Sequence, residues 1–369
     1  MRIAIDCRMI GSGGIGSFIS ELIPYFLEEN ECLLIGSHGQ CAPFLRLANV
    51  EFCFCDIKPF SLKETFFFPQ DVLEAIHHYD VYFTPYCNIP SGINLPIFSV
   101  IHDVVFLDVK GLTSILGKIG RKMFYKRAIN YSNAIFTVSE FSKERIIHHL
   151  KCKKPLKIVY NSAPSYLKEP FEKKAEKKDQ ILFVGNIKKH KGLKILLDAF
   201  ENARKTDENF KSKLVIVGNA ENFRTGDEET VERIKRIDSS ADSQNISQNG
   251  SESLVVFTGK ISNDELKYLY AESKFLVQPS LYEGFGLPPL EALTVGTRAI
   301  ISDIPVFKEI YGGLPVTFFK SESAGDLAEK MLAFKDEPFT ENEKELISSK
   351  YSYKKSAEII LKEFAQNRP

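Results

Sequence analysis

The chain lacks a net charge. Its 48 Lys and Arg residues are balanced by 48 Asp and Glu residues, so the formal charge at pH 7 is zero. A protein that binds nucleic acid usually carries an excess of basic residues over the whole binding domain. The composition therefore argues against a nucleic-acid partner.

Long apolar runs are also missing. No stretch approaches the roughly 20 apolar residues that span a bilayer. The sequence enters a strand-like pattern at residues 2–6, without the charged and apolar segments of a signal peptide. We therefore expect a cytoplasmic protein, for which membrane contact would be peripheral.

Paired metal-binding motifs are absent as well. The chain has seven Cys, an odd number, with none after Cys152. Cys53 and Cys55 are one residue apart, closer than in common zinc knuckles, and no second pair exists. No Asp-x-Asp pair, the usual metal clamp for a diphosphate, occurs. We expect reduced, mostly buried thiols, no bound metal and no cofactor.

What the sequence does contain is an alternation of short apolar runs and helical patterns, which is typical of a parallel sheet flanked by helices. A helix is predicted over residues 18–28, with Ile19, Leu22, Ile23 and Phe26 on one side. In the first half, strands are predicted at residues 2–6, 32–35, 81–84, 97–101, 134–138 and 157–160.

The same alternation restarts after a charged, Pro-containing stretch that reads as a linker. In this second half, strands are predicted at residues 181–184, 214–217, 255–257, 275–278 and 298–301, and helices at 193–202 and 353–366. Residues 239–253 are rich in Ser, Asn, Gln and Asp and predict a mobile surface loop.

The alternation predicts an α/β protein with two Rossmann-like domains. We place the first domain at 1–165, the linker at 166–180, the second domain at 181–350, and at 351–369 a helix that crosses back to the first domain. Ligands of such sheets bind beyond the carboxyl ends of the strands, so function should lie in the loops that follow strands.

The most specific segment is EGFGLPPLE, residues 283–291. Gly284 and Gly286 let its backbone approach a ligand closely, and the N–H groups of the loop and of the following helix start attract an anion such as phosphate. Glu283 and Glu291, eight positions apart, can each accept two sugar hydroxyls. This layout suits a nucleotide sugar, although Glu291 as a helix cap and Glu283 as a loop charge is the plain alternative.

This segment resembles the E-x7-E motif of retaining glycosyltransferases of the GT-B fold, specifically glycosyltransferase family 4 and its mannosyltransferase-like subset. The resemblance covers nearly the whole chain. Its other motifs lie at residues 1–25, 101–103, 138–142, 160–161, 184–192 and 257–260.

The resemblance implies two domains that face each other across a cleft, the first binding the acceptor and the second the nucleotide sugar. It implies that Glu283 and His102 act on the donor hexose as catalytic residues, that Glu291 binds the ribose, and that Lys191 binds the phosphates. The remaining donor-binding residues that it implies are Gly14, Gly16, Asn186, Lys260, Ile261, Gly284, Phe285, Gly286 and Leu287.

One position departs from the pattern. Many relatives carry an Arg where this chain has Asn186, which leaves one phosphate charge to be supplied by Lys188 or Lys189. The mannosyltransferase-like subset also lacks this Arg. Read without the resemblance, Lys191 is a surface Lys near a helix start, and His102 is a structural His beside Asp103, which could cap the next turn.

Residues 11–16 match G-x-G-x-x-G, the dinucleotide fingerprint. The glycines begin several residues after the strand end predicted at Asp6, and the second strand is followed by Gly36, Ser37 and His38 and by no acid. A nicotinamide dehydrogenase is therefore disfavoured. We interpret the glycines as a loop whose backbone approaches the donor phosphate or the acceptor.

A basic segment at residues 110–127 has six Lys and Arg residues, no acid, and interleaved apolar residues. Such a helix could lie on an anionic membrane, or pack on the sheet with its charges in solvent.

We expect a retaining, metal-independent glycosyltransferase that moves a hexose from a nucleotide-sugar donor to a glycan or lipid-linked glycan acceptor in surface polysaccharide or glycoconjugate synthesis. GDP-mannose is the first expectation, with UDP- and dTDP-linked hexoses open. Loops at residues 60–69 and 84–94 would shape the acceptor site. The alternatives are an inactive sugar-nucleotide-binding scaffold subunit and a GT-B nucleotide-sugar epimerase.

Overall fold

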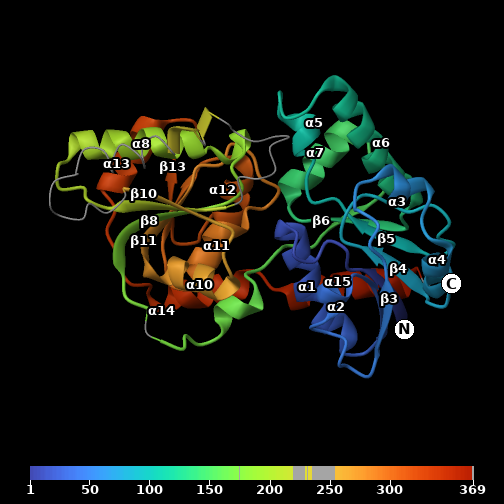
Figure 1. The fold of residues 1–369 in the computed structure, drawn as a ribbon. Helices are drawn as coiled ribbons and strands as arrows, with labels where there is room; N and C mark the ends of the chain where they lie inside the picture. The colour runs from blue at the N-terminus through green and yellow to red at the C-terminus, as the bar shows by residue number, and fades with distance from the viewer. Residues whose placement is uncertain (174, 219–228, 231, 235–253, 368–369) are drawn as a thin grey trace. The chain divides into compact units, whose positions relative to one another are not determined.

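A computed structural model describes residues 1–173, 175–218, 229–230, 232–234 and 254–367, and its contacts divide the chain into two compact units (Figure 1). Unit 1 comprises Met1–Ser162 and Tyr351–Pro369, and unit 2 comprises Ala163–Lys350. The predicted loop at 239–253 lies outside the described residues.

Unit 1 is built on a seven-stranded parallel sheet with the order β3-β2-β1-β4-β5-β6-β7. One helix follows β1, one follows β2, two follow β3, two follow β5 and one follows β6. The strands are β1 (Arg2–Asp6), β2 (Glu31–Gly36), β3 (Val50–Phe54), β4 (Val81–Thr84), β5 (Ile97–Val100), β6 (Ala134–Thr137) and β7 (Leu156–Ile158). The helices are α1 (Gly13–Leu27), α2 (His38–Cys41), α3 (Leu62–Phe66), α4 (Gln70–His77), α5 (Val105–Asp108), α6 (Ile115–Tyr131), α7 (Glu140–Leu150) and α15 (Tyr353–Gln366).

Helices cover both faces of this sheet because successive strand residues point to opposite sides. Ala4 faces a core that contains residues of α4, α6 and α7. Its neighbours Ile3 and Ile5 face a second core, shared with α1 and α15. Phe364 of α15 is fully buried there against Phe98, at 4.6 Å between ring centroids. The last helix is therefore a structural part of unit 1.

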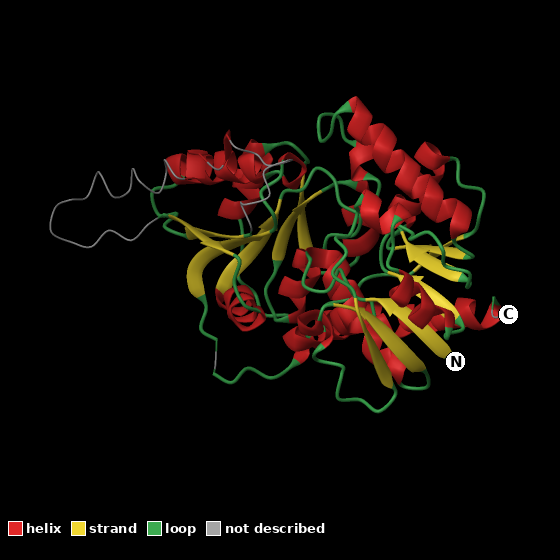
Figure 2. Ribbon diagram, turned by 45° about the vertical axis from the view of Figure 1, so that its right-hand side comes forward, coloured by secondary structure: helices red, strands yellow, loops and turns green. Residues whose placement is uncertain are grey.

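Unit 2 is built on a six-stranded parallel sheet with the order β10-β9-β8-β11-β12-β13, flanked by helices in the same way (Figure 2). Its strands are β8 (Lys178–Val184), β9 (Lys213–Val217), β10 (Val255–Gly259), β11 (Ser273–Gln278), β12 (Ala299–Ser302) and β13 (Val316–Phe319). Its helices include η1 (Ser165–Lys168), η2 (Lys189–Lys191), α8 (Leu193–Thr206), α10 (Asn263–Glu272), α11 (Leu287–Thr294), α12 (Pro305–Tyr311), α13 (Ala324–Leu332) and α14 (Glu341–Lys350).

Most of these helices and strands were predicted from the sequence, and some were not. Every predicted strand is present, with ends within three residues of the prediction, whereas β3 and β13 were not predicted. The segment predicted as a linker, 166–180, contains most of η1 and the start of β8. All seven cysteines are free and six of them are buried, as expected. In the described part of the chain, no helix has the length and apolar content needed to cross a bilayer.

Candidate active site

The candidate donor site of unit 2 lies where the strand order reverses, between β8 and β11. In open parallel sheets, ligands bind beyond the carboxyl ends of the strands at this point, because the two following loops diverge there. The loop after β8 contains η2, and the loop after β11 contains the segment that begins at Pro279.

These two loops are fastened to each other through their backbones. The N–H group of Leu281 donates to the carbonyl of His190 at 2.8 Å. Gly192 has a left-handed backbone, with φ of 70°, and a Cβ atom there would lie 1.9 Å from the carbonyl oxygen of Pro279. Because only glycine permits this approach, the sequence Lys191-Gly192 holds the lysine against the second loop.

The fastening brings Lys191 and Glu283 together, 92 positions apart in the chain. The Lys191 Nζ atom lies 2.7 Å from both carboxylate oxygens of Glu283. The Glu283 side chain is 8% exposed and that of Lys191 is 22% exposed. Two residues that the sequence analysis assigned to one nucleotide-sugar site thus form a largely buried ion pair.

A short polar chain orients the Glu283 carboxylate. The Ser280 hydroxyl donates to Glu283 Oε1 at 2.8 Å, and the Gln278 side chain donates to the Ser280 hydroxyl at 2.9 Å. Both residues are fully buried. Sequence reasoning missed them, although a Gln and a Ser at the end of an otherwise apolar strand are a usable signal, since buried polar groups need partners.

Lys191 is the residue of η2 whose positive charge lies next to Glu283. The neighbouring His190 is buried, and burial together with the charge of Lys191 lowers its pKa to about 4. It is therefore neutral at physiological pH. Asn186 and Lys189 are exposed and Lys188 is half-buried. The expectation that Lys188 or Lys189 replaces the missing Arg stays a prediction.

The loop from Gly284 to Leu287 leads into α11 through a tight turn. Gly286 has φ of 83°, and a Cβ atom there would lie 2.4 Å from the ring of Phe307. Gly284, Phe285 and Gly286 are buried, and Leu287 is half-buried.

The start of α11 offers few N–H donors to an anion. Pro288 and Pro289 have no N–H group, and the N–H group of Leu290 donates to the Tyr311 hydroxyl at 3.2 Å. Of the first four helix residues, Leu287 is thus the one whose N–H group remains for a ligand. Prolines suit the first turn of a helix because they lack that group, and the expectation that N–H groups of the loop and of the helix start attract an anion stays a prediction.

Glu291 is the fifth residue of α11, and the residue that caps the start of this helix is Gly286. Its side chain accepts a hydrogen bond from the Tyr270 hydroxyl at 2.5 Å. Burial raises the pKa of Glu291 to about 7, against the opposing effect of that hydrogen bond. The carboxyl therefore keeps its proton to a higher pH than an exposed glutamate does. Sequence reasoning missed Tyr270, which is fully buried in α10.

Lys260 and Ile261 follow β10, the edge strand two positions from β8. Lys260 is exposed and Ile261 is half-buried. Among the described residues, no hydrogen bond or ion pair joins either of them to Lys191 or Glu283. Their expected role in binding the donor stays a prediction.

In unit 1, His102 follows β5 at the carboxyl end of the sheet. Its Nε2–H group donates to the carbonyl of Pro85 at 2.9 Å, and its ring packs edge-on against Phe18 at 5.1 Å. Burial lowers its pKa to about 4. His102 is thus a neutral imidazole with Nδ1 as its acceptor atom. Asp103 accepts from the N–H group of Val105 at 3.0 Å, which agrees with its alternative capping role.

The glycine-rich turn differs from the loop that we predicted. Helix α1 begins at Gly13, so Gly14 and Gly16 lie in its first turns. Gly16 is buried, and a Cβ atom there would lie 2.4 Å from the carbonyl oxygen of Met9, so packing alone requires this glycine. Gly14 is exposed, with no atom near its missing Cβ. The helix forms despite three glycines because its later turns bury an apolar stripe.

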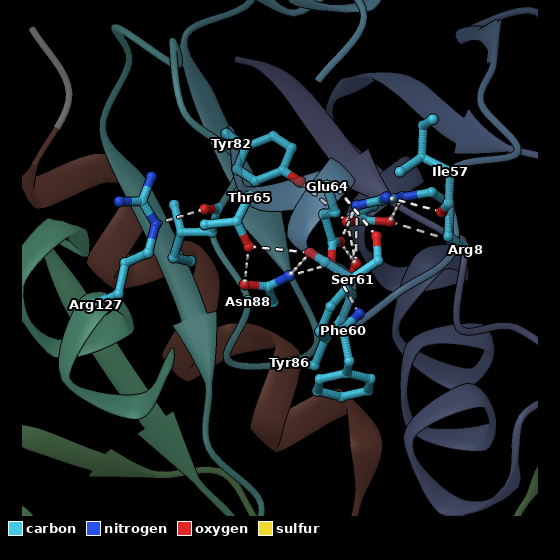
Figure 3. Close-up of polar contacts among 12 residues, drawn as sticks. Arg8, Ile57, Phe60, Ser61, Glu64, Thr65, Tyr82, Tyr86, Asn88 and Arg127 are labelled. Atoms are coloured by element: carbon cyan, nitrogen blue, oxygen red, sulfur yellow. Dashed lines mark hydrogen bonds and ion pairs between the residues drawn. The ribbon is translucent and has the colours of Figure 1, made fainter. Parts of the chain in front are cut away.

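A buried polar cluster lies beside the end of β1 (Figure 3). Arg8 Nη2 lies 2.6 Å from both Asp6 Oδ2 and Glu64 Oε1, and Arg8 Nη1 donates to the carbonyl of Ile57 at 3.1 Å. The Tyr86 hydroxyl also contacts Glu64. Burial raises the pKa of Glu64, although Arg8 opposes the shift. This cluster, which the sequence analysis missed, anchors the following loops to the sheet.

The anchored loop exposes aromatic side chains. The N–H group of Phe60 donates to Glu64 Oε2 at 2.8 Å, and this holds Phe60 in a left-handed conformation with φ of 60°. The exposed apolar residues of this segment are Phe60, Leu62, Phe66 and Phe67. The segment overlaps the loop at 60–69 that we expected to shape an acceptor site.

Comparison with curated proteins finds glycosyltransferases. The chain is 29% identical over 199 residues to the O-antigen chain mannosyltransferase RfbU of Salmonella typhimurium, a match that covers 53% of this chain and 50% of that protein. It is 34% identical over 142 residues to the serotype-specific mannosyltransferase WbdA of Escherichia coli, covering 37% of this chain and 16% of that protein. The chain thus spans half or less of the length of these relatives.

Comparison with solved structures shows the fold over the full chain. Sucrose-phosphate synthase from Thermosynechococcus elongatus matches with a TM-score of 0.70 and 16% identity, over 99% of this chain and 98% of that one. HepE from Anabaena, solved with UDP and glucose, matches with a TM-score of 0.70 and 16% identity, over 99% and 100%. The two Rossmann-like units therefore have the GT-B fold.

A family model described as glycosyl transferases group 1 matches residues 167–355. This range is about half of the chain and includes Lys191, Glu283 and Glu291. By this match, and with mannosyltransferases among its relatives, the chain belongs to the glycosyl transferases group 1 family.

Proposed function

We propose that this protein is a retaining glycosyltransferase of family 4, which moves mannose from GDP-mannose to a glycan or lipid-linked glycan acceptor in surface polysaccharide synthesis. The observation that carries the proposal is the Lys191–Glu283 pair at the reversal point of the unit 2 sheet. The relatives named as mannosyltransferases support mannose as the sugar.

The ion pair defines how the donor would bind. A diphosphate attracts Lys191 and takes a share of its charge, which frees the Glu283 carboxylate for the hydroxyls of the hexose. Lys191 and the N–H group of Leu287 then stabilise the charge that grows on the departing nucleoside diphosphate. Glu283 balances the positive charge that develops at the anomeric carbon, and Ser280 keeps its carboxylate in place.

The ribose and hexose hydroxyls need acceptors. Glu291 accepts from the ribose, with Tyr270 fixing its carboxyl group. His102, neutral and with Nδ1 as acceptor, accepts a hydrogen bond from a hexose hydroxyl. The acceptor hydroxyl attacks on the side from which the nucleotide leaves, so the anomeric configuration is retained. The exposed aromatic residues 60–67 of unit 1 receive the acceptor, since sugar rings stack on aromatic faces.

The donor is tested by thermal unfolding with GDP, UDP, dTDP, ADP and their sugar conjugates. We expect GDP and GDP-mannose to raise the melting temperature by roughly 5–10 °C at about 100 times Kd, because only the folded state binds them. Lys191→Ala should lose this shift, and Lys191→Arg, which keeps the charge, should retain part of it.

Lys178→Ala is the matched control, because Lys178 forms an ion pair with Glu272 at 2.5 Å at the opposite end of β8. This variant should keep the full shift. Absence of a shift from every nucleotide would contradict the proposal, whereas a shift without any sugar transfer would favour an inactive sugar-nucleotide-binding scaffold subunit. A shift with UDP conjugates alone would overturn the assignment of the donor base.

Metal independence and retention of the anomeric configuration are tested by two measurements on the same transfer reaction. Transfer measured with excess EDTA should match transfer with Mg²⁺, because Lys191 and backbone donors take the place of a metal at the diphosphate. NMR of the product should show the same anomeric configuration as the donor. A loss of activity in EDTA that Mg²⁺ restores, or a product of inverted configuration, would refute the corresponding part of the proposal.

A further inference from the structure

Helix α6 of unit 1 exposes large apolar side chains along one side. Ile115 is 79% exposed, Leu116 80%, Ile119 61% and Met123 51%. At 3.6 residues per turn, these four positions fall within an arc of about 100°. Single exposed apolar residues are normal on a protein surface, but a contiguous helical stripe of four marks an interaction site.

The stripe is not the face by which α6 packs onto its own unit. The buried residues of the helix are Tyr125, Ala128 and Ile129, which lie in its second half and on the opposite side. None of residues 115–124, all of which the structure describes, is buried. The helix thus has two apolar faces, which explains why its sequence pattern is not cleanly two-sided. Its first half gains little from the core of unit 1.

The charge along α6 is of one sign. The helix has five Lys and Arg residues and no acidic residue. Lys122 and Lys126 are exposed and Lys118 is half-buried, and within residues 1–173 that the structure describes none of the three forms an ion pair. On the helical wheel, Lys126 lies within the apolar stripe and Lys122 borders its edge, whereas Lys118 lies further round, toward the buried face.

The two arginines of α6 are occupied by the protein itself. The Arg121 guanidinium lies 3.5 Å from the ring centroid of Phe106. Arg127 donates to the carbonyl of Ile89 and to the hydroxyl of Ser91, each at 2.8 Å. The arginines therefore fix the helix on unit 1, and the lysines remain as the charges available to a partner.

We propose that the outward face of α6, formed by Ile115, Leu116, Ile119, Met123, Lys122 and Lys126, with Lys118 at its margin, binds the surface of an anionic lipid bilayer. The helix lies in the plane of the interface, with the apolar stripe among the upper acyl chains. The lysine stems run along the apolar region while their ammonium groups reach the lipid phosphates. Anionic lipid fits this surface because it offers negative charge beside apolar material, and it matches three lysines for which the described residues provide no acidic partner.

The inference does not depend on the proposed function, since vesicle binding is measured without any sugar donor. The full chain is mixed with vesicles of phosphatidylcholine with phosphatidylglycerol, or of phosphatidylcholine alone, and bound protein is separated by flotation. We expect binding to the anionic vesicles that weakens with added salt. The variant Leu116→Ser/Ile119→Ser should lose at least about tenfold in partitioning.

The contribution of charge is tested separately. The variant Lys118→Gln/Lys122→Gln/Lys126→Gln should lose on the order of 10²-fold on anionic vesicles and nothing on neutral ones. Ile359→Ser is the matched apolar control, because Ile359 is a 40% exposed isoleucine on α15 of the same unit. This control should bind as the wild type does.

Depth of insertion is read with a fluorescent probe. The chain contains no tryptophan, so Leu116→Trp introduces a unique reporter. Its emission should shift to the blue on anionic vesicles, whereas that of Ile359→Trp should not. Wild-type protein that fails to float with anionic vesicles would overturn the inference. So would a wild-type dimer that Leu116→Ser/Ile119→Ser converts to a monomer, because a second copy of the chain would then cover the stripe.

Discussion

The substitution Glu283→Gln is expected to reduce sugar transfer by at least about 10²-fold while nucleotide binding persists. The amide keeps the shape of the side chain and still accepts from Ser280, so unit 2 should fold normally. What is lost is the negative charge that balances the anomeric carbon. Transfer is measured as nucleoside diphosphate released in the presence of acceptor, and binding as the thermal shift produced by GDP.

The ion pair sharpens this test. In wild-type protein, Glu283 competes with the diphosphate for Lys191, because Nζ contacts both carboxylate oxygens at 2.7 Å. Glu283→Gln removes the competitor, so GDP should bind as tightly as before or more tightly. If the ion pair had only a structural role, Glu283→Gln would instead lower both the melting temperature and the affinity for GDP.

Two further variants complete the comparison. Lys191→Ala leaves the buried Glu283 carboxylate without its cation and should destabilise unit 2, since breaking a buried pair costs about 3–5 kcal/mol. Adding Glu283→Gln to Lys191→Ala should restore much of this stability and no activity. Glu272→Gln, in the ion pair at the far end of β8, should retain full transfer; Glu283→Gln with transfer within a few-fold of wild type would refute the catalytic role.

The substitution Glu291→Gln is expected to stabilise unit 2 above neutral pH. The carboxyl has a pKa of about 7 in the folded protein because it is buried, against an ordinary value of 4.5. Between these values, the unfolded chain has lost the proton and the folded chain retains it. The free energy of unfolding therefore falls as the pH rises through this window, by about 3 kcal/mol in total.

Glutamine cannot ionise, but it can still accept the hydrogen bond of Tyr270. The variant should therefore match wild-type stability near pH 4.5 and exceed it by on the order of 1–3 kcal/mol at pH 8, as measured by urea unfolding at both values. An equal difference at both pH values would contradict the shifted pKa. The same variant should weaken the binding of GDP-mannose, because a ribose hydroxyl loses a charged acceptor.

Glu265→Gln is the control of opposite sign. The N–H group and hydroxyl of Ser262 donate to the Glu265 carboxylate and lower its pKa. A lowered pKa contributes stability that is present above the ordinary value and lost in acid. This variant should therefore lose stability at neutral pH, where Glu291→Gln gains it. If Glu291→Gln gains stability and loses ligand binding, the Glu291 carboxylate is kept for function at a cost in stability.

Much of the fold could be read from periodicity, because buried parallel strands are apolar runs and the helices between them carry apolar stripes. The residues of β3 and β13 explain why these two strands were not predicted. None of the five residues of β3 is buried, and only one of the four residues of β13 is; both strands lie at a sheet edge. Edge strands need less apolar surface than central ones, so composition alone marks them poorly.

The candidate site was only partly readable. The motif at Glu283 and Glu291 and the lysine at 191 could be assigned from local spacing and resemblance. That Lys191 touches Glu283 follows from the pairing of β8 with β11, which no local pattern contains. The Tyr270 partner of Glu291 and the cluster of Arg8 with Asp6 and Glu64 likewise depend on tertiary packing.

The return of α15 to unit 1 sets the order in which the chain can fold during synthesis. Domains usually fold as they leave the ribosome, the first before the second. Here the core shared by α1 and β1 is completed by Phe364 and Ile360, which are translated after all of unit 2. Until α15 has been synthesised, the first unit therefore keeps an aromatic face uncovered, and its folding is completed by a helix that follows unit 2 in the chain.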